Sequence, residues 1–187
     1  LYGGVKGNFG ATDFTWDVGF LQYFYPGNVA AGGAKGDTSE VYGALGWKWL
    51  TFKASYAVSG KAFAVQDAQG TYYVDLSAAY PVGETGVTLI AHYGMQKYQG
   101  TDARNPGPAS NRASNDTIYS YNDYKLGASY DLGKLTKVLN AVTLGAYYNN
   151  TSSADSRGYG GRGDAPAGPY PKAISGSTGV VYLQKTF

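Results

Sequence analysis

Few residues of this sequence could do chemistry. It holds no cysteine and a single histidine, His92, beside 13 aspartate and glutamate residues. Two of the carboxylates, Asp75 and Asp123, are candidates for a general acid–base pair, and His92 could activate one of the many serines as a nucleophile. One histidine without a thiol argues against a histidine-based or thiolate metal site, and no cofactor is expected. Nothing in the sequence alone pairs Asp75 with Asp123. Whether the two carboxylates meet depends on the strands that carry them.

Composition narrows the class of protein. The net charge is only +2, so no nucleic-acid partner is expected. Charged residues make up 15% of the chain, against about 25% in soluble domains, and tyrosine is abundant at 19 residues. Tyrosine suits a surface that is partly apolar and partly wet, such as a membrane interface. The mean hydropathy of −0.30 fits a soluble β-protein and a membrane barrel equally. Barrel strands alternate lipid-facing apolar residues with lumen-facing polar ones, so their average hydropathy is low.

Alternation of apolar and polar residues dominates the chain and predicts nine strands. In the clearest one, Phe14, Trp16 and Val18 share one face while Thr15 and Asp17 share the other. The expected strands run about 7–12 residues, closer to the 9–11 of a tilted membrane strand than to the 5–6 typical of globular sheets. They cover residues 1–7, 14–25, 40–49, 51–59, 71–80, 87–98, 121–130, 142–149 and 178–187.

The connections between these strands alternate in length. Short links fall at 8–13, around 50 and at 81–86, while 131–141 is intermediate and could hold one amphipathic turn. The long links are rich in Gly, Ala, Ser, Asn and Pro, and comprise 26–39, 60–70, 99–120 and 150–177. Short turns at one end and long loops at the other are typical of outer-membrane barrels, whose short turns are periplasmic. The alternative is a soluble β-protein with uneven loops.

This alternation also predicts the number of strands. The last strand follows a long outer loop and therefore runs inward, and tracing back makes the first strand run inward too. Single-chain bacterial barrels have an even number of strands with both termini periplasmic. We therefore expect residues 1–187 to be one all-β domain, an antiparallel up-and-down transmembrane β-barrel lacking about three N-terminal strands of about twelve.

The apolar strand faces are expected to meet outer-membrane lipid. All three tryptophans, Trp16, Trp47 and Trp49, fall near the short-turn end, as an interfacial aromatic belt requires. Strand middles carry aliphatic residues instead. Lys97 and Lys185 fall on this face near strand ends, where a lysine costs about 0–1 kcal/mol against about 2–4 at the bilayer midplane.

The opposite, polar faces carry charges that a dry core would tolerate only as pairs. We expect them to line a small wet lumen, narrow at about twelve strands and weakly ion-selective because the charges are mixed. A closed salt-bridge network without conduction is the alternative. His92 on this face cannot reach lipid, which argues against the Ser–His chemistry of outer-membrane lipases, and no enzyme activity is expected. The predicted pore-lining residues are Lys6, Asp17, Glu40, Lys48, Lys53, Asp75, His92, Asp123 and Lys125.

Two stretches carry a family resemblance. The chain opens with Leu1-Tyr2-Gly3-Gly4, and a second strand reads Asp17-Val18-Gly19-Phe20-Leu21-Gln22-Tyr23-Phe24-Tyr25-Pro26-Gly27. Together they resemble the TorF-like family of outer-membrane porins, loosely continued by Tyr124-Lys125-Leu126-Gly127-Ala128-Ser129-Tyr130. The resemblance implies an integral protein of the Gram-negative outer membrane with further strands before these, and it supplies no catalytic residues.

The C-terminus adds a second resemblance. Phe187, with Leu183 and Val181 on the same face, is similar to the terminal aromatic signal read by the barrel assembly machinery, although Lys185 departs from it.

The function expected from the sequence is a porin-like channel for passive diffusion of small hydrophilic solutes. The alternative is a structural or adhesive outer-membrane barrel with a plugged lumen, whose long loops bind a partner. A homo-oligomer and an envelope protein partner both stay open.

Overall fold

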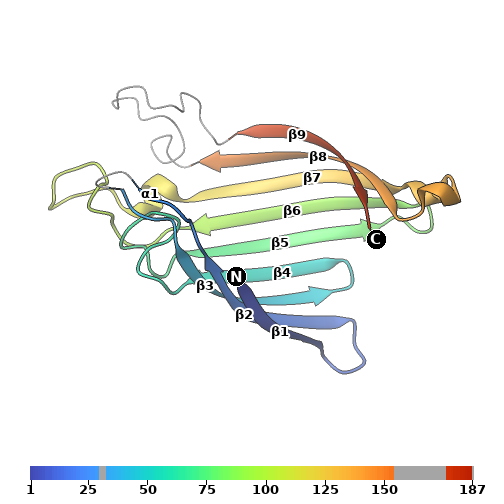
Figure 1. Cartoon of the computed structure of the whole chain (residues 1–187), viewed down its shortest axis with the longest axis horizontal. Coiled ribbons are helices and arrows are strands. Elements are labelled where there is room, and N and C mark those ends of the chain that lie inside the picture. The colour runs from blue at the N-terminus through green and yellow to red at the C-terminus, as the bar shows by residue number, and fades with distance from the viewer. Residues whose placement is uncertain (30–32, 154–175, 187) are drawn as a thin grey trace.

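Nine antiparallel strands form one sheet in the computed structural model, which describes residues 1–29, 33–153 and 176–186. The strands pair strictly in chain order, from β1 to β9, and the sheet is coiled rather than flat (Figure 1). They are β1 Tyr2–Asn8, β2 Phe14–Tyr23, β3 Thr38–Trp47, β4 Leu50–Ala57, β5 Tyr72–Pro81, β6 Val87–Lys97, β7 Tyr121–Asp131, β8 Val142–Ser153 and β9 Ser177–Lys185.

All nine strands predicted from alternation are confirmed, as is their up-and-down order. The predicted closure of the sheet into a barrel is not confirmed. Among the described residues β1 and β9 are not hydrogen-bonded to each other, so the sheet is open. The predicted alternation of connections is also present. Short turns gather at one end of the sheet. The long β2–β3, β4–β5 and β6–β7 connections gather at the other, and the last of them contains the short helix α1, Asn115–Tyr119 (Figure 1).

One departure from the predicted boundaries, between β3 and β4, affects a predicted site residue. A continuous strand to residue 49 was expected, but β3 ends at Trp47 and a two-residue turn of Lys48 and Trp49 follows. Lys48 has a φ of 52°, in the left-handed region that reverses the chain. The expected amphipathic turn in 131–141 is instead two short 3-10 helices, Leu132–Lys134 and Lys137–Leu139.

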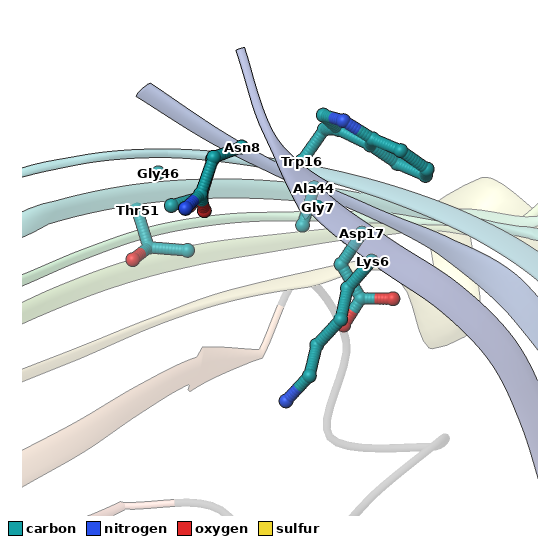
Figure 2. A pocket seen from close by; sticks show the side chains of 9 residues that line it. Lys6, Gly7, Asn8, Trp16, Asp17, Ala44, Gly46 and Thr51 are labelled. Atoms are coloured by element: carbon teal, nitrogen blue, oxygen red, sulfur yellow. The ribbon is translucent and has the colours of Figure 1, made fainter. Parts of the chain in front are cut away.

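The apolar face of the sheet is the exposed one. Leu76 and Leu144 are 45% and 44% exposed, whereas Glu40, Ser55 and Gln96 on the polar face are only 5–7% exposed. The polar side chains point to the concave side of the coiled sheet and the apolar ones away from it. Figure 2 shows Trp16 on one side of the ribbon and Lys6 with Asp17 on the other. This arrangement is the reverse of a soluble sheet that buries its apolar face.

The small buried core lies among the loops rather than behind the sheet. The β4–β5 connection contributes Ala62, Val65 and Ala68, which pack with Ala57 and Tyr98. Phe63 and Tyr119, the last residue of α1, pack against this group. The loops therefore form a structured cap at the long-loop end of the polar face.

Some predicted features lie outside the described residues. These are Phe187 of the terminal signal and residues 154–175, most of the predicted 150–177 loop. In the part of the chain that is described, no helix has the length and apolar character needed to cross a bilayer.

Candidate functional site

One row of side chains crosses the polar face from β1 to β8. Strand register places its members directly opposite one another, so they project to the same side of the sheet. The charged members of the row alternate in sign over the first strands, and the last two are carboxylates. Five of the nine predicted pore-lining residues belong to this row. The row reads Lys6, Asp17, Ala44, Lys53, Asp75, Gly94, Asp123 and Thr151.

A second row lies two residues nearer the short turns and carries two more predicted residues, His92 and Lys125, which are opposite each other. The first row begins over a hollow of about 610 Å³ lined by Lys6 and Asp17 and by Thr51 of β4 (Figure 2). The strands thus gather seven predicted residues into two adjacent bands.

His92 lies between two carboxylates. Its Nδ1 is 2.6 Å from Asp75 Oδ2, and its Nε2 is 2.6 Å from Asp123 Oδ1. The three side chains are only 15–22% exposed. Each ring nitrogen therefore meets a carboxylate oxygen at hydrogen-bond distance, and the imidazole bridges the two carboxylates. The pairing of Asp75 with Asp123 that the sequence left open is therefore made through His92.

Two hydroxyls complete this network. Tyr73 Oη donates to Asp123 Oδ2 at 3.1 Å, and Ser77 Oγ donates to Asp75 Oδ1 at 2.8 Å. Ser77 also lies 3.2 Å from His92 Nδ1, but Asp75 is the closer partner of that nitrogen. Because Asp75 occupies the nitrogen that would act as a base, the geometry does not favour Ser77 as a nucleophile.

Gly94 makes the space for these contacts. A Cβ there would overlap Tyr73 Oη and lie 2.6 Å from Asp123 Oδ2. The same relationship recurs elsewhere on the polar face: a Cβ on Gly19 would lie 2.7 Å from the Tyr42 ring, and one on Gly145 would overlap Tyr182. Tyrosines thus lie over glycines of the neighbouring strand, a packing that protects glycine within a sheet. Sequence reasoning assigned these tyrosines and glycines no role.

Two lysines of the polar face lie over tyrosine rings. Lys53 Nζ is 4.4 Å from the centroid of Tyr42, whose hydroxyl donates to Asp17 Oδ1 at 3.0 Å. Lys125 Nζ is 5.2 Å from the centroid of Tyr147. Cation–π contact keeps each ammonium on the wall of the concave face.

Lys48 does not belong to this wall, and its prediction as a strand residue of the polar face is wrong. It lies in the β3–β4 turn, its Nζ is 3.6 Å from Asp13 Oδ2 of the neighbouring turn, and it also lies over Trp47. The turn takes two residues out of the strand, so alternation counted through it assigns Lys48 to the wrong place.

Glu40, the last of the predicted residues, lies nearer the long-loop end. With Lys53 and Asp75 it lines a second hollow of about 560 Å³, whose other lining residues are five aromatic ones with Ser55 and Gln96. Within the described residues no group of three histidine, aspartate or glutamate side chains is placed to hold a metal ion.

The whole chain, residues 1–187, matches the family model described as "Bacterial protein of unknown function (Gcw_chp)". The chain belongs to the Gcw_chp family. No curated protein and no solved structure matches it. The resemblance to TorF-like porins stays a prediction.

The loop cap of this Gcw_chp protein is held by polar groups. Asp102, fully buried, pairs with the guanidinium of Arg104 and accepts from Gln66 N at 2.8 Å. The buried Asn115 donates to Gln99 O at 2.7 Å and accepts from Asp102 N at 2.9 Å. The Gln66–Asp102 bond, together with one from Asn115 Nδ2 to Gln66 O at 3.1 Å, joins the β4–β5 and β6–β7 connections.

Two carboxyls of the cap are shifted in pKa. Burial on its own would raise the pKa of Asp102, but hydrogen bonds from the Arg104 side chain and from the backbone N–H groups of Arg104 and Gln66 outweigh it and lower the pKa to about 2. A hydrogen bond from Lys97, 2.8 Å away, lowers the pKa of Asp116. Both groups therefore hold the cap as anions at neutral pH.

Proposed function

We propose that this Gcw_chp protein is a transmembrane β-barrel of the bacterial outer membrane, through whose polar lumen small hydrophilic solutes diffuse passively. The observation that carries the proposal is the inverted burial of the sheet. Large apolar side chains are exposed along nearly every strand, while charged and amide side chains lie on the less exposed concave face. Hydrocarbon outside and water inside is the environment that stabilises this arrangement.

An aromatic ladder supports the membrane assignment. Across β2 to β5, at the short-turn end, Phe14 stacks on Trp47 with centroids 6.2 Å apart. Trp47 lies 6.3 Å from Trp49, and Trp49 lies 5.3 Å from Tyr80. All four rings are 37–49% exposed. A band of exposed aromatics at one height is what a headgroup interface selects.

Closure is part of the proposal. The outer edges of β1 and β9 leave backbone N–H and C=O groups that hydrocarbon would not satisfy. Three further strands between these edges would pair them and produce an even number, about twelve. A barrel of that size would leave a narrow pore.

The proposed mechanism is diffusion along the charged rows. Solutes would pass a wall formed by Lys6, Asp17, Lys53, the Asp75–His92–Asp123 group and Lys125, with Glu40 nearer the long loops. Because positive and negative groups alternate, selectivity would come mainly from pore width and only weakly from charge.

Planar-bilayer recording of the full-length protein tests the proposal. We expect discrete conductance steps that rise with salt concentration and show a weak ion preference. A protein that migrates as a folded, heat-modifiable barrel on gels yet never conducts would remove the pore function while leaving the membrane fold. A protein that partitions away from detergent would remove both.

A second candidate function is a plugged barrel with an adhesive or structural role. The packed core of the loop cap and the buried Asp102–Arg104 pair favour it, because an ordered cap at one end of the polar face could obstruct a lumen. Shortening residues 99–120 distinguishes the two. The pore function predicts a changed conductance, whereas the adhesive function predicts loss of partner binding with conductance unchanged.

A further inference from the structure

The hollow beneath the loop cap has walls of two kinds. Charged side chains of β3 to β5, Glu40, Lys53 and Asp75, lie on the sheet side. Aromatic rings surround them: Tyr23 and Phe63 meet edge to face with centroids 5.2 Å apart, and Tyr73, Tyr98 and Tyr121 add further rings. Its volume of about 560 Å³ falls within the range of small-molecule sites, about 300–1,000 Å³.

Gln96 lines this hollow with an unused hydrogen-bonding group. The residue is only 5% exposed, and within the described part of the chain its Nε2 has no hydrogen-bond partner. Register places it directly between Tyr73 and Tyr121. An unsatisfied buried amide costs about 1–3 kcal/mol, so Gln96 needs a hydrogen-bond acceptor in the hollow, which a ligand oxygen could supply.

The charges of the hollow already have partners. Asp75 is contacted at both oxygens, by Ser77 Oγ at 2.8 Å and by His92 Nδ1 at 2.6 Å, and Lys53 is opposite in charge to Glu40. A ligand with a net charge would therefore gain little from this wall. Carboxylates accept hydrogen bonds, Lys53 and Gln96 donate them, and rings pack on C–H groups. A solute that meets these three kinds of group carries many hydroxyls on a compact, neutral ring whose face presents C–H groups.

We propose that this hollow is a binding site for neutral saccharides, of one or two sugar rings, with the Gln96 amide donating to a sugar hydroxyl and the tyrosine rings packing on the sugar face. The inference rests on the proposed function, since it names the class of solute that the lumen would take. Such a site would concentrate sugar at the long-loop end of the pore.

Titration calorimetry on the full-length protein in detergent micelles tests the site independently of conductance. The probes are glucose and maltose, with gluconate as the anion and glucosamine as the cation. We expect millimolar or tighter binding of a neutral sugar and weaker binding of both charged analogues. No binding of either neutral sugar, or tighter binding of a charged one, would overturn the inference.

The variant Gln96→Leu removes the amide at nearly constant volume. We expect it to weaken neutral-sugar binding roughly tenfold, which corresponds to one lost hydrogen bond. Gln184→Leu makes the same change on the polar face of β9, away from the hollow, and should leave affinity unchanged. If Gln96→Leu does not fold, Tyr23→Leu, which removes a ring of the wall, should weaken binding similarly.

The outcomes separate this inference from the pore function. Sugar binding with no conductance would retain the site and remove the pore. Conductance with no sugar binding, or with equal affinity in Gln96→Leu and the unchanged protein, would retain the pore and remove the site.

Discussion

His92 Nε2 lies 2.6 Å from Asp123 Oδ1, although the residue directly opposite His92 on β7 is Lys125. The contact is diagonal, and the position that permits it is Gly94. Gly94 is the register partner of both Asp75 and Asp123. With no side chain between the two carboxylates, the imidazole two residues away reaches both.

Replacing Gly94 with alanine should therefore disrupt the network. The new Cβ would overlap Tyr73 Oη and press on Asp123, and overpacking of this kind destabilises by about 1–3 kcal/mol. The measurement is the temperature at which the protein no longer migrates as a folded, heat-modifiable barrel on a gel. Gly43→Ala, whose Cβ would meet only Val18 Cγ1 at 3.9 Å, is the control and should be tolerated. Equal behaviour of the two variants would contradict this account of Gly94.

Removing the His92 imidazole should alter ion selectivity. His92→Gln removes the ring that bridges Asp75 and Asp123, so the two carboxylates are more open to the lumen and the pore becomes more cation-selective. The reversal potential under a salt gradient measures this. Lys48→Gln removes a charge from the β3–β4 turn, off the polar face, and should leave the potential unchanged. A shift in Lys48→Gln as large as in His92→Gln would argue that Lys48 lines the pore after all.

The loop cap should open in acid. Because the pKa of Asp102 is lowered to about 2 from an ordinary value near 3.8, its ion pair stabilises the cap fully above about pH 4, and that contribution is lost as the pH falls toward 2. The shift corresponds to about 2 kcal/mol. Hydrogen exchange of residues 99–120 should rise over this window while the strands stay protected.

Asp102→Asn should show the same loosening already at neutral pH. Asp67→Asn, which alters an exposed carboxylate of the β4–β5 connection, is its control and should not. Protection of the cap that is indifferent to pH and to Asp102→Asn would contradict a role for this pair.

A charge on the apolar face should prevent insertion. Leu76→Arg places a cation on the exposed apolar face of β5, where the penalty at mid-bilayer is about 2–4 kcal/mol. Thr51→Arg adds the same charge to the polar face of β4 and should be accepted. The yield of folded protein in the outer-membrane fraction checks both. Equal yields would indicate that Leu76 does not face lipid.

The strand pattern of this protein was predictable because each strand alternates with period two and both faces are chemically distinct. Alternation therefore determined the nine strands, their order and the sidedness of Asp17, Asp75 and Leu76. It failed at Lys48, since a two-residue turn removes residues from the count without any change in composition.

Contacts between strands belong to the tertiary structure. Which carboxylate meets His92, that Gly94 makes room for it, and that Gln96 is buried beside an aromatic hollow all depend on register. Register depends on the geometry of each turn and on packing between the paired strands, which alternation within one strand does not reveal. The sequence determined which face of each strand is polar; only the paired sheet decided which polar groups touch.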